Sequence, residues 1–299
     1  ATTASRLADL AEAGYELVVT HGNGPQVGNI LLQNEEARHR APPMPLDVCV
    51  AQSQAQIGYL LQQALQNEFA TRGQPRAVAS VITQVVVDPD DPAFESPTKP
   101  VGPVYEAEQE VIVKRAKGWS MARDPRGGWR RLVPSPRPLE IVEKDLIRRL
   151  LATGDASVLI AAGGGGIPVV RHRSGYRGVE AVIDKDLVAA LLAHQLGADA
   201  LLLLTDVESV CLNWGSARPV PIHETLPEEL RAHPFAAGSI KPKVEAACRF
   251  VEAGGKIAGI GRLEDAAAIL EGLRGTIVRP GGVTLERQLV VLLRLGTGH

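Results

Sequence analysis

The stretch YELVVTHGNGPQVG, residues 15–28, decides how the rest of the chain is organised. Residues 15–20 are mostly apolar or β-branched, with Glu16 the only charge, and predict a short strand, which two glycines around Asn23 then break. Pro25 suits the first turn of a helix, where its missing N–H leaves no hydrogen bond unmade. A strand, a glycine turn and a helix N-terminus in this order form an anion site, because backbone N–H groups and the helix dipole converge there. The spacing matches neither the dinucleotide fingerprint nor the Walker A loop, so an ordinary tight turn remains an equal alternative.

Composition excludes several classes of protein. The 299 residues allow one large α/β domain or two small ones, and 45% hydrophobic residues suffice for a substantial core. A net charge of −2 gives no electrostatic basis for binding nucleic acid or an anionic membrane. Cys49, Cys211 and Cys248 lie far apart without metal-ligand spacing, which favours free thiols in a reducing compartment. No signal peptide is apparent, and the longest apolar run, residues 198–204, has the length of a strand, so we expect a cytoplasmic protein.

The first third of the chain predicts alternating helices and strands. Helices are expected over residues 5–13, 25–38 and 46–71, and strands over residues 15–20 and 78–87. The helix at 46–71 carries an apolar stripe that includes Gly58, so that another helix can approach closely. Core packing explains the stripe, but this helix is longer than one small sheet needs to cover, so a dimer interface is the alternative.

Residues 88–140 predict a small protruding subdomain inserted into the main sheet. The segment DPDDPAFESPTKPVGP is rich in proline and acid and predicts a loop. A short helix is expected over residues 107–117, and a hairpin from residues 119–121 and 129–133. Lys99 lies between two prolines, and a stiffened loop would hold this lysine at low entropic cost.

The second half returns to strand–helix alternation. We expect helices over residues 141–153, 184–196, 241–253 and 263–273, strands over 157–162, 200–204, 257–260 and 276–279, and a hairpin over 169–179. Four glycines, residues 163–166, follow a buried strand and are entropically expensive, which suggests backbone pressed against a ligand. Ligands bind at the carboxyl ends of parallel strands, and Lys99, Lys185 and Lys243 can all reach that edge.

This inventory favours phosphoryl transfer. Lysines beside glycine turns suit a polyphosphate ligand, since backbone N–H groups supply shape and ammonium groups supply charge. The sequence offers no His-Cys cluster for zinc and no serine nucleophile elbow.

Seven segments together resemble the carbamate kinases of the amino acid kinase family. They are HGNGPQVG (21–28), TQVVVDPDDPAFESPTKPVGP (83–103), WRRLVPSP (129–136), AAGGGGIPV (161–169), GVEAVIDKDL (178–187), LLTDV (203–207) and GSIKPKVEA (238–246). The resemblance spans residues 5–280 and implies a three-layer α/β/α sandwich on a mainly parallel sheet, with a small protruding subdomain, in a homodimer. It also implies reversible transfer of phosphate between ATP and carbamate, with Mg²⁺, giving ADP and carbamoyl phosphate.

The resemblance assigns roles to individual positions. The turn near the transferred phosphoryl group is matched by Gly22, Asn23 and Gly24. The glycine loop on the carbamate side is matched by Gly163, Gly164, Gly165 and Gly166. The catalytic group is matched by Lys99 from the protruding subdomain, by Lys185 and Lys243, which neutralise the moving phosphate, and by Asp186, which orients them. The nucleotide wall is matched by Thr205, Asp206, Val207 and Trp214, closed by Gly238, Ser239 and Pro242. No protein ligand for a metal is implied, since Mg²⁺ is expected through the nucleotide phosphates.

The two ends of the chain depart from the family pattern. The family begins with a strand running into Gly-Gly-Asn-Ala, whose backbone also holds the transferred phosphate, and no such stretch opens this chain. The family usually ends near Pro280, whereas residues 281–299 form a C-terminal extension here. We expect residues missing from the start and a surface tail. In the alternative, QLVVLLRL at 288–295 fills the vacant strand position and brings Gly296 and Gly298 toward the phosphate site.

Three functional hypotheses follow. The first is an active carbamate kinase, favoured by the presence of Lys99, Lys185, Asp186 and Lys243. The second is a nucleotide-binding paralogue or truncated form with little catalysis, favoured by the altered start. The third is an amino acid kinase acting on another small acid, which the specific segment at 83–103 argues against.

Overall fold

The computed structural model describes residues 2–116, 118–124, 127–154, 157–216, 218–235, 240–280 and 289–294. The strands in chain order are β1 (Glu16–His21), β2 (Val78–Ser80), β3 (Gln84–Val87), β4 (Lys99–Tyr105), β5 (Ser120–Arg123), β6 (Trp129–Val133), β7 (Pro138–Ile141), β8 (Val158–Ile160), β9 (Ile167–His172), β10 (Gly175–Gly178), β11 (Ala200–Leu204), β12 (Cys211–Leu212), β13 (Val220–Pro221), β14 (Glu224–Thr225), β15 (Ile257–Gly261), β16 (Thr276–Val278) and β17 (Leu289–Arg294). The helices are α1 (Thr2–Glu12), α2 (Gly24–Ala37), α3 (Leu46–Thr71), α4 (Glu108–Ala116), α5 (Lys144–Ala152), α6 (Lys185–Leu196), α7 (Pro227–Ala232), α8 (Ile240–Glu252) and α9 (Ala266–Leu270), with 3-10 turns at Pro92–Phe94, Gly163–Gly165 and Leu263–Asp265.

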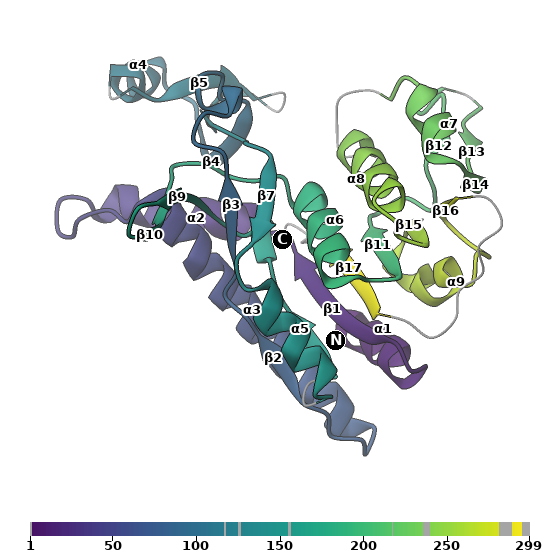
Figure 1. Cartoon of the computed structure of the whole chain (residues 1–299). Helices are drawn as coiled ribbons and strands as arrows, with labels where there is room; N and C mark the ends of the chain where they lie inside the picture. Colours follow the sequence, from purple (N-terminus) through teal and green to yellow (C-terminus); the bar gives the residue numbers. More distant parts are fainter. Residues whose placement is uncertain are drawn as a thin grey trace.

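The central sheet is mainly parallel, as the sequence predicted. Among the described residues its strand order is β14-β16-β15-β11-β17-β1-β8-β2 (Figure 1). The pairs in this sheet run parallel apart from β15 and β16, which are antiparallel. The carboxyl ends of β1, β8 and β11 therefore meet at one edge, where an open α/β sheet binds its ligands.

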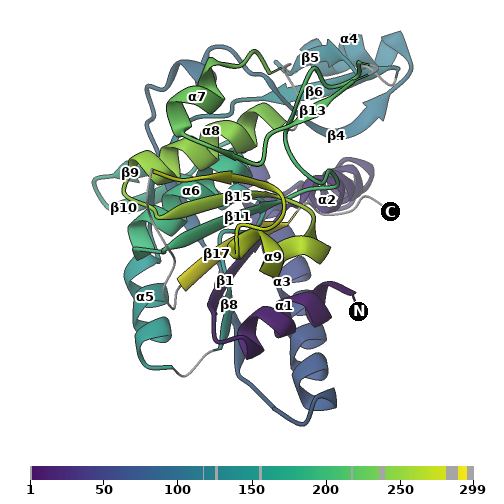
Figure 2. The ribbon, with the colours of Figure 1, turned by 90° about the vertical axis from the view of Figure 1, so that its right-hand side faces the viewer.

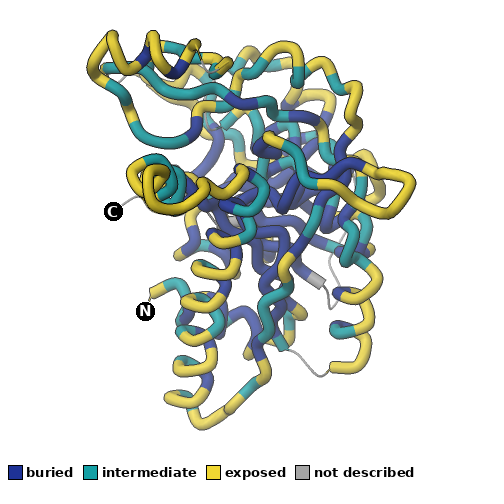
Figure 3. The backbone as a smooth tube through the Cα atoms, turned by 90° about the vertical axis from the view of Figure 1, so that its left-hand side faces the viewer, coloured by how far each residue is buried: buried dark blue, intermediate teal, exposed yellow. Residues whose placement is uncertain are grey.

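Helices cover both faces of this sheet, which makes the three-layer arrangement (Figure 2). Successive side chains of a strand point to opposite faces. In β1, Val18 packs in the cluster that contains residues of α5, α6 and α8, whereas Leu17 and Val19 pack in the cluster with residues of α1, α3 and α9. Buried residues accordingly concentrate along the sheet in the middle of the molecule (Figure 3).

The C-terminal segment supplies a central strand of the sheet. β17 lies between β1 and β11 and runs parallel to both, with Val291 opposite Val18 on one side and Leu201 on the other. Val290, Val291 and Leu292 are fully buried. The expectation of a surface tail is therefore wrong for these residues, and residues 289–294 enter the sheet, as the alternative predicted for this segment. Gly296 and Gly298 lie outside the described residues.

The protruding subdomain stands away from the central sheet (Figure 1). It consists of the three-stranded sheet β4-β6-β5 together with α4. The predicted hairpin of β5 and β6 and the predicted short helix are both present. Lys99, however, does not lie in a loop. It opens β4 and pairs with Val133 of β6, so strand pairing as well as the flanking prolines fixes its position.

Two sequence assignments need correction because strand partners are chosen by tertiary contacts rather than by local propensity. The single strand expected over residues 78–87 is two strands in different sheets. β2 belongs to the central sheet, and β3 belongs to the sheet β10-β9-β3-β7. Gln54 of α3 holds the chain between them, as its side-chain amide accepts from the Thr83 N–H and donates to the Thr83 carbonyl. Residues 138–141, expected to include the start of a helix, form β7 against β3, so α5 begins only at Lys144.

Candidate active site

The turn after β1 forms one wall of the site. Gly22, Asn23 and Gly24 line a cavity at the carboxyl edge of the sheet. Asn23 is buried, precedes the first turn of α2, and donates its side-chain amide to the Ser53 hydroxyl at 2.8 Å. Pro25 occupies the first turn of α2, as predicted. The N-terminus of α2, which carries the positive end of the helix dipole, therefore lies at this cavity.

The glycine loop after β8 packs mainly against protein. Gly164, Gly165 and Gly166 have φ angles of 68°, 91° and 75°, which side-chain-bearing residues rarely adopt. A Cβ at Gly164 would lie 2.2 Å from the Asn23 amide, and one at Gly163 would lie 2.2 Å from the His21 ring. Of the four glycines, only Gly164 lines the cavity. The others pack closely against other parts of the protein, Gly163 against the His21 ring, Gly165 against the Ile183 carbonyl and Gly166 against the Val85 side chain, which is a different use from the direct ligand contact expected.

The start of α6 gathers the charged groups. Asp184 caps the helix, since its carboxylate accepts from the backbone N–H of Asp186 at 3.0 Å and also binds the Lys99 ammonium at 2.8 Å. Asp186 is buried and accepts from the ammonium of Lys243 at 2.6 Å. Lys243, near the start of α8, is only 1% exposed. The resemblance predicted that Asp186 orients Lys185 and Lys243, and in the structure its carboxylate pairs with Lys243.

The pKa values of the two carboxylates are shifted in opposite directions. Burial raises the pKa of Asp184, but the Lys99 ammonium and two helix N–H groups outweigh it, so this pKa lies below its ordinary value. Burial raises the pKa of Asp186 above its ordinary value, against the opposing effect of Lys243. Asp184 is thus the more firmly ionised of the two, which suits a residue that must anchor a lysine from another element.

Lys185 differs from Lys99 and Lys243 in its ion pairing. Within the described part of the chain its ammonium has no ion-pair partner, whereas those of Lys99 and Lys243 are each bound to a carboxylate. Burial lowers the pKa of Lys185, the nearby carboxylate of Asp186 opposes this, and the ammonium of Lys243 adds to it. An anionic ligand beside Lys185 would restore the charge balance.

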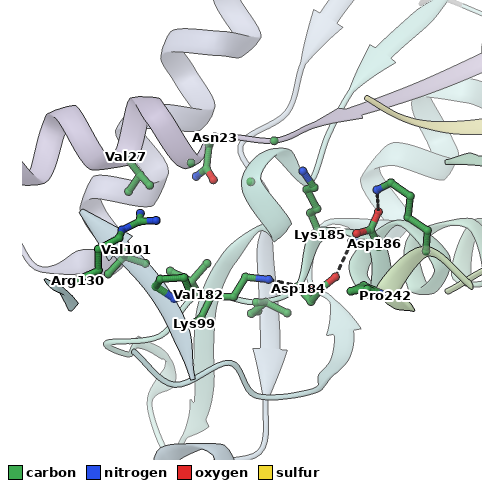
Figure 4. Close-up of a pocket in the computed structure, with 16 residues that line it drawn as sticks. Asn23, Val27, Lys99, Val101, Arg130, Val182, Asp184, Lys185, Asp186 and Pro242 are labelled. Carbon is green, nitrogen blue, oxygen red and sulfur yellow. Dashed lines mark hydrogen bonds and ion pairs between the residues drawn. The ribbon is translucent and has the colours of Figure 1, made fainter. Parts of the chain in front are cut away.

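These groups share a cavity of about 280 Å³ (Figure 4). Its lining includes four basic side chains, those of Lys99, Arg130, Lys185 and Lys243, and two carboxylates, those of Asp184 and Asp186. The excess of positive charge suits a polyanion. Sequence reasoning did not select Arg130 or Asp184 as site residues. For Arg130 the available signal was the doubled arginine of WRRLVPSP, which does not show which arginine faces the cavity.

Of the described residues that were predicted to bind the nucleotide, one, Pro242, lines the cavity. Thr205 and Asp206 follow β11 at the same sheet edge but are not in its lining, Val207 is half-buried, and Trp214 is 70% exposed. Gly238 and Ser239 lie outside the described residues. Their roles stay predictions.

The described residues contain no group of three or more His, Cys, Asp or Glu side chains arranged to hold a metal ion. They also contain no helix with the length and apolar character needed to cross a membrane.

Comparisons with known proteins agree on the family. The model of the amino acid kinase family matches residues 1–260. A carbamate kinase from Pyrococcus horikoshii is 47% identical over 284 residues, which cover 93% of this chain and 90% of that protein. A carbamate kinase from Halobacterium salinarum is 48% identical, with 93% and 89% covered. The structure of a carbamate kinase from Giardia lamblia bound to AMP-PNP superposes with a TM-score of 0.86 at 44% identity, covering 93% of this chain and 89% of that one. The chain belongs to the amino acid kinase family, and within it to the carbamate kinases.

Proposed function

We propose that this protein is a carbamate kinase that transfers phosphate reversibly between ATP and carbamate. One observation carries the proposal. Lys99 from the protruding subdomain, Lys185 from α6 and Lys243 from α8 line one cavity beside the glycine turn that follows β1. Three cations from three separate elements meet beside the N-terminus of α2, and phosphoryl transfer needs such an arrangement of positive charge.

The reaction requires positioning and charge neutralisation rather than a general base. Carbamate already carries its nucleophilic oxygen as an anion. That oxygen attacks the terminal phosphorus of ATP, the bond to the bridging oxygen breaks, and ADP leaves with the electron pair. Lys185 and Lys243 would neutralise the transferred group, Asp186 would hold Lys243 in place, and Lys99 would approach from the subdomain.

The cavity fits a magnesium ion that arrives with the nucleotide. Its two carboxylates, Asp184 and Asp186, each already bind a lysine, so the described residues of the lining leave no unpaired acid for a metal. Mg²⁺ would therefore be held by nucleotide phosphates, where it supplies further charge neutralisation.

Incubating the protein with ADP, Mg²⁺ and carbamoyl phosphate is expected to produce ATP, measured by a coupled luminescence assay. Binding of ADP without ATP formation would favour the nucleotide-binding paralogue instead. ATP-dependent phosphorylation of another small acid, without turnover of carbamate, would favour a different amino acid kinase. An Asp186→Asn variant is a useful negative control, since it removes the charge that holds Lys243.

Lys99→Ala is expected to lose turnover while its affinity for ADP changes little. Lys99 reaches the site from the protruding subdomain, so it acts chiefly when that subdomain is closed over bound substrates. The matched control is Lys256→Ala, because Lys256 also forms a partly exposed ion pair, with Asp199. Steady-state rates and ADP titration of both variants make the comparison. An equal loss of rate and ADP affinity at Lys99 would instead indicate a fixed nucleotide contact.

We further propose a two-fold homodimer built on the outer face of α3. Val50 and Leu65 of the predicted stripe are buried within the subunit, and Gly58 allows Ser80 rather than another helix to approach. Tyr59 and Leu60 are 60% and 53% exposed, and this apolar surface would suit a second copy of the chain.

Sedimentation is expected to give a dimer at micromolar concentration. Leu60→Glu should shift it toward monomer, because the charge would have to be desolvated at the interface. Leu146→Glu, on an equally exposed leucine of α5, serves as the control and should leave the dimer intact. A wild-type protein that sediments as a stable monomer would rule the interface out.

The cellular setting is also a proposal. Cys49, Cys211 and Cys248 are free thiols, which favours a reducing compartment such as the cytoplasm. The net charge of −2 favours small-molecule substrates over nucleic acid or a membrane surface as partners.

A further inference from the structure

Arg130 of β6 lines the cavity, but it is not among the site residues predicted from the sequence. Figure 4 shows it beside Val27 and Val101, at the end of the cavity away from Asp186 and Pro242. Because Lys99 lies between these two ends, Arg130 is separated from the cluster at the start of α6. Any ligand group it contacts is therefore different from the one that Lys243 contacts.

The guanidinium of Arg130 is held loosely. Its Nη1 lies 3.4 Å from Asp124 Oδ2, and its Nη2 donates to the Gly102 carbonyl at 3.2 Å. Both contacts are longer than the 2.7–2.9 Å typical of charge-assisted hydrogen bonds. Its Nε is buried and has no hydrogen-bond partner among the described residues. A buried donor without an acceptor is unfavourable, so this guanidinium gains from an added acceptor.

The neighbouring residue Arg131 makes closer contacts than Arg130 does. Side chains alternate along β6, so Arg131 points to the opposite face from Arg130. Arg131 pairs with Glu180 at 2.9 Å and stacks on the Trp119 ring, 4.4 Å from its centroid. Arg131 is thus occupied by contacts to Trp119 within the subdomain and to Glu180 outside it, whereas Arg130, which lines the cavity, keeps a donor without a partner among the described residues.

We propose that Arg130 binds the small anionic substrate, through the carboxyl-type oxygens of carbamate and the matching end of carbamoyl phosphate. This inference rests on the proposed function. A planar guanidinium can donate two parallel hydrogen bonds to the carboxylate of carbamate, which an ammonium group cannot reproduce. In carbamoyl phosphate the carbonyl oxygen and the oxygen that joins the carbamoyl group to phosphorus take the places of the two carboxylate oxygens. Lys185 and Lys243 lie toward the opposite end of the cavity and Lys99 lies between, so the lysines are left for the phosphoryl groups. Because Arg130 and Lys99 lie on paired strands of one small sheet, the subdomain would bring both to the substrate together.

The test compares Arg130→Gln and Arg130→Lys with the control Arg123→Gln. Arg123 lies in the same subdomain but is exposed and stacks on Trp129, so its loss removes the same charge without touching the cavity. In ATP formation, both Arg130 variants are expected to raise KM for carbamoyl phosphate by ~30-fold or more, the effect of losing charge-assisted hydrogen bonds. ADP affinity, measured by calorimetry, should change by less than about twofold, since Arg130 lies away from the nucleotide end. The control should match the wild type in both.

Three outcomes would overturn the inference. An unchanged KM for carbamoyl phosphate with a lowered melting temperature would show that Arg130 only stabilises the fold, through its contacts with Gly102 and Asp124. An equal loss of ADP affinity would make it a nucleotide contact. Full recovery of KM in Arg130→Lys would show that charge alone matters and that no paired hydrogen bonds form.

A binding measurement separates this inference from the proposed function. Freshly dissolved carbamoyl phosphate is titrated into the wild type and the variants in the cold, without nucleotide. If the wild type makes no ATP, the proposed function fails, and weaker binding by Arg130→Gln alone still supports the site. If the wild type turns over but binds carbamoyl phosphate no better than Arg130→Gln, only the inference fails.

Discussion

Deleting residues 282–299 is expected to leave a protein that aggregates or fails to fold. The deletion removes β17, which lies between β1 and β11 in the middle of the central sheet. Val291 packs on one face of the sheet, and Val290 and Leu292 pack on the other. At about 1.5–3 kcal/mol for each fully buried side chain, their loss amounts to ~5–9 kcal/mol. That is comparable to the whole stability of a typical domain, and two unpaired strand edges would be exposed as well.

Solubility and the melting temperature measure the result. A shorter deletion, of residues 296–299, keeps β17 and provides the matched control. If the shorter form folds normally but loses turnover, the expectation that glycines after β17 serve the phosphate site gains support. A soluble 282–299 deletion with an unchanged melting temperature would contradict the role of β17 in the sheet.

Lys185→Ala is expected to lower turnover by about 100- to 1000-fold, the range seen when one preorganised group that stabilises a transition state is removed. Within the described residues Lys185 has no ion-pair partner, and alanine is a good helix former, so the fold should survive.

Lys243→Ala is expected to behave differently. It would leave the buried carboxylate of Asp186 without its partner and destabilise the fold by about 3–5 kcal/mol.

Turnover, melting temperature and circular dichroism of Lys185→Ala test this, with Lys256→Ala as the control for loss of one ammonium group. Because burial lowers the pKa of Lys185, wild-type turnover should also fall as the pH rises through that lowered value. The protonated form is the active one, so the loss begins below the pH at which an ordinary lysine titrates. Near-normal turnover of Lys185→Ala would remove this residue from the mechanism.

Local sequence signals were sufficient where the determining interactions lie close in the chain. The bounds of α3 follow from prolines before Leu46 and from apolar spacing within the helix, so residues 46–71 were predicted as found. The turn after β1 was also predicted, because two glycines and Pro25 act on their own backbone. The order of strand–turn–helix units then placed Lys185 and Lys243 at one sheet edge, since parallel strands share that edge.

The sequence by itself therefore determined α3, the turn after β1, the mainly parallel α/β class and four of the charged residues that line the cavity, namely Lys99, Lys185, Asp186 and Lys243. Only the tertiary structure decided which strands became neighbours, and hence that β17 enters the centre of the sheet and that residues 78–87 divide between two sheets. It also decided that Arg130 rather than Arg131 faces the cavity, since the two have the same chemistry and differ only in the face of β6 they occupy. The reason is physical: a strand satisfies its hydrogen bonds with distant segments, so its partners and its exposed face are set by contacts that no local pattern contains.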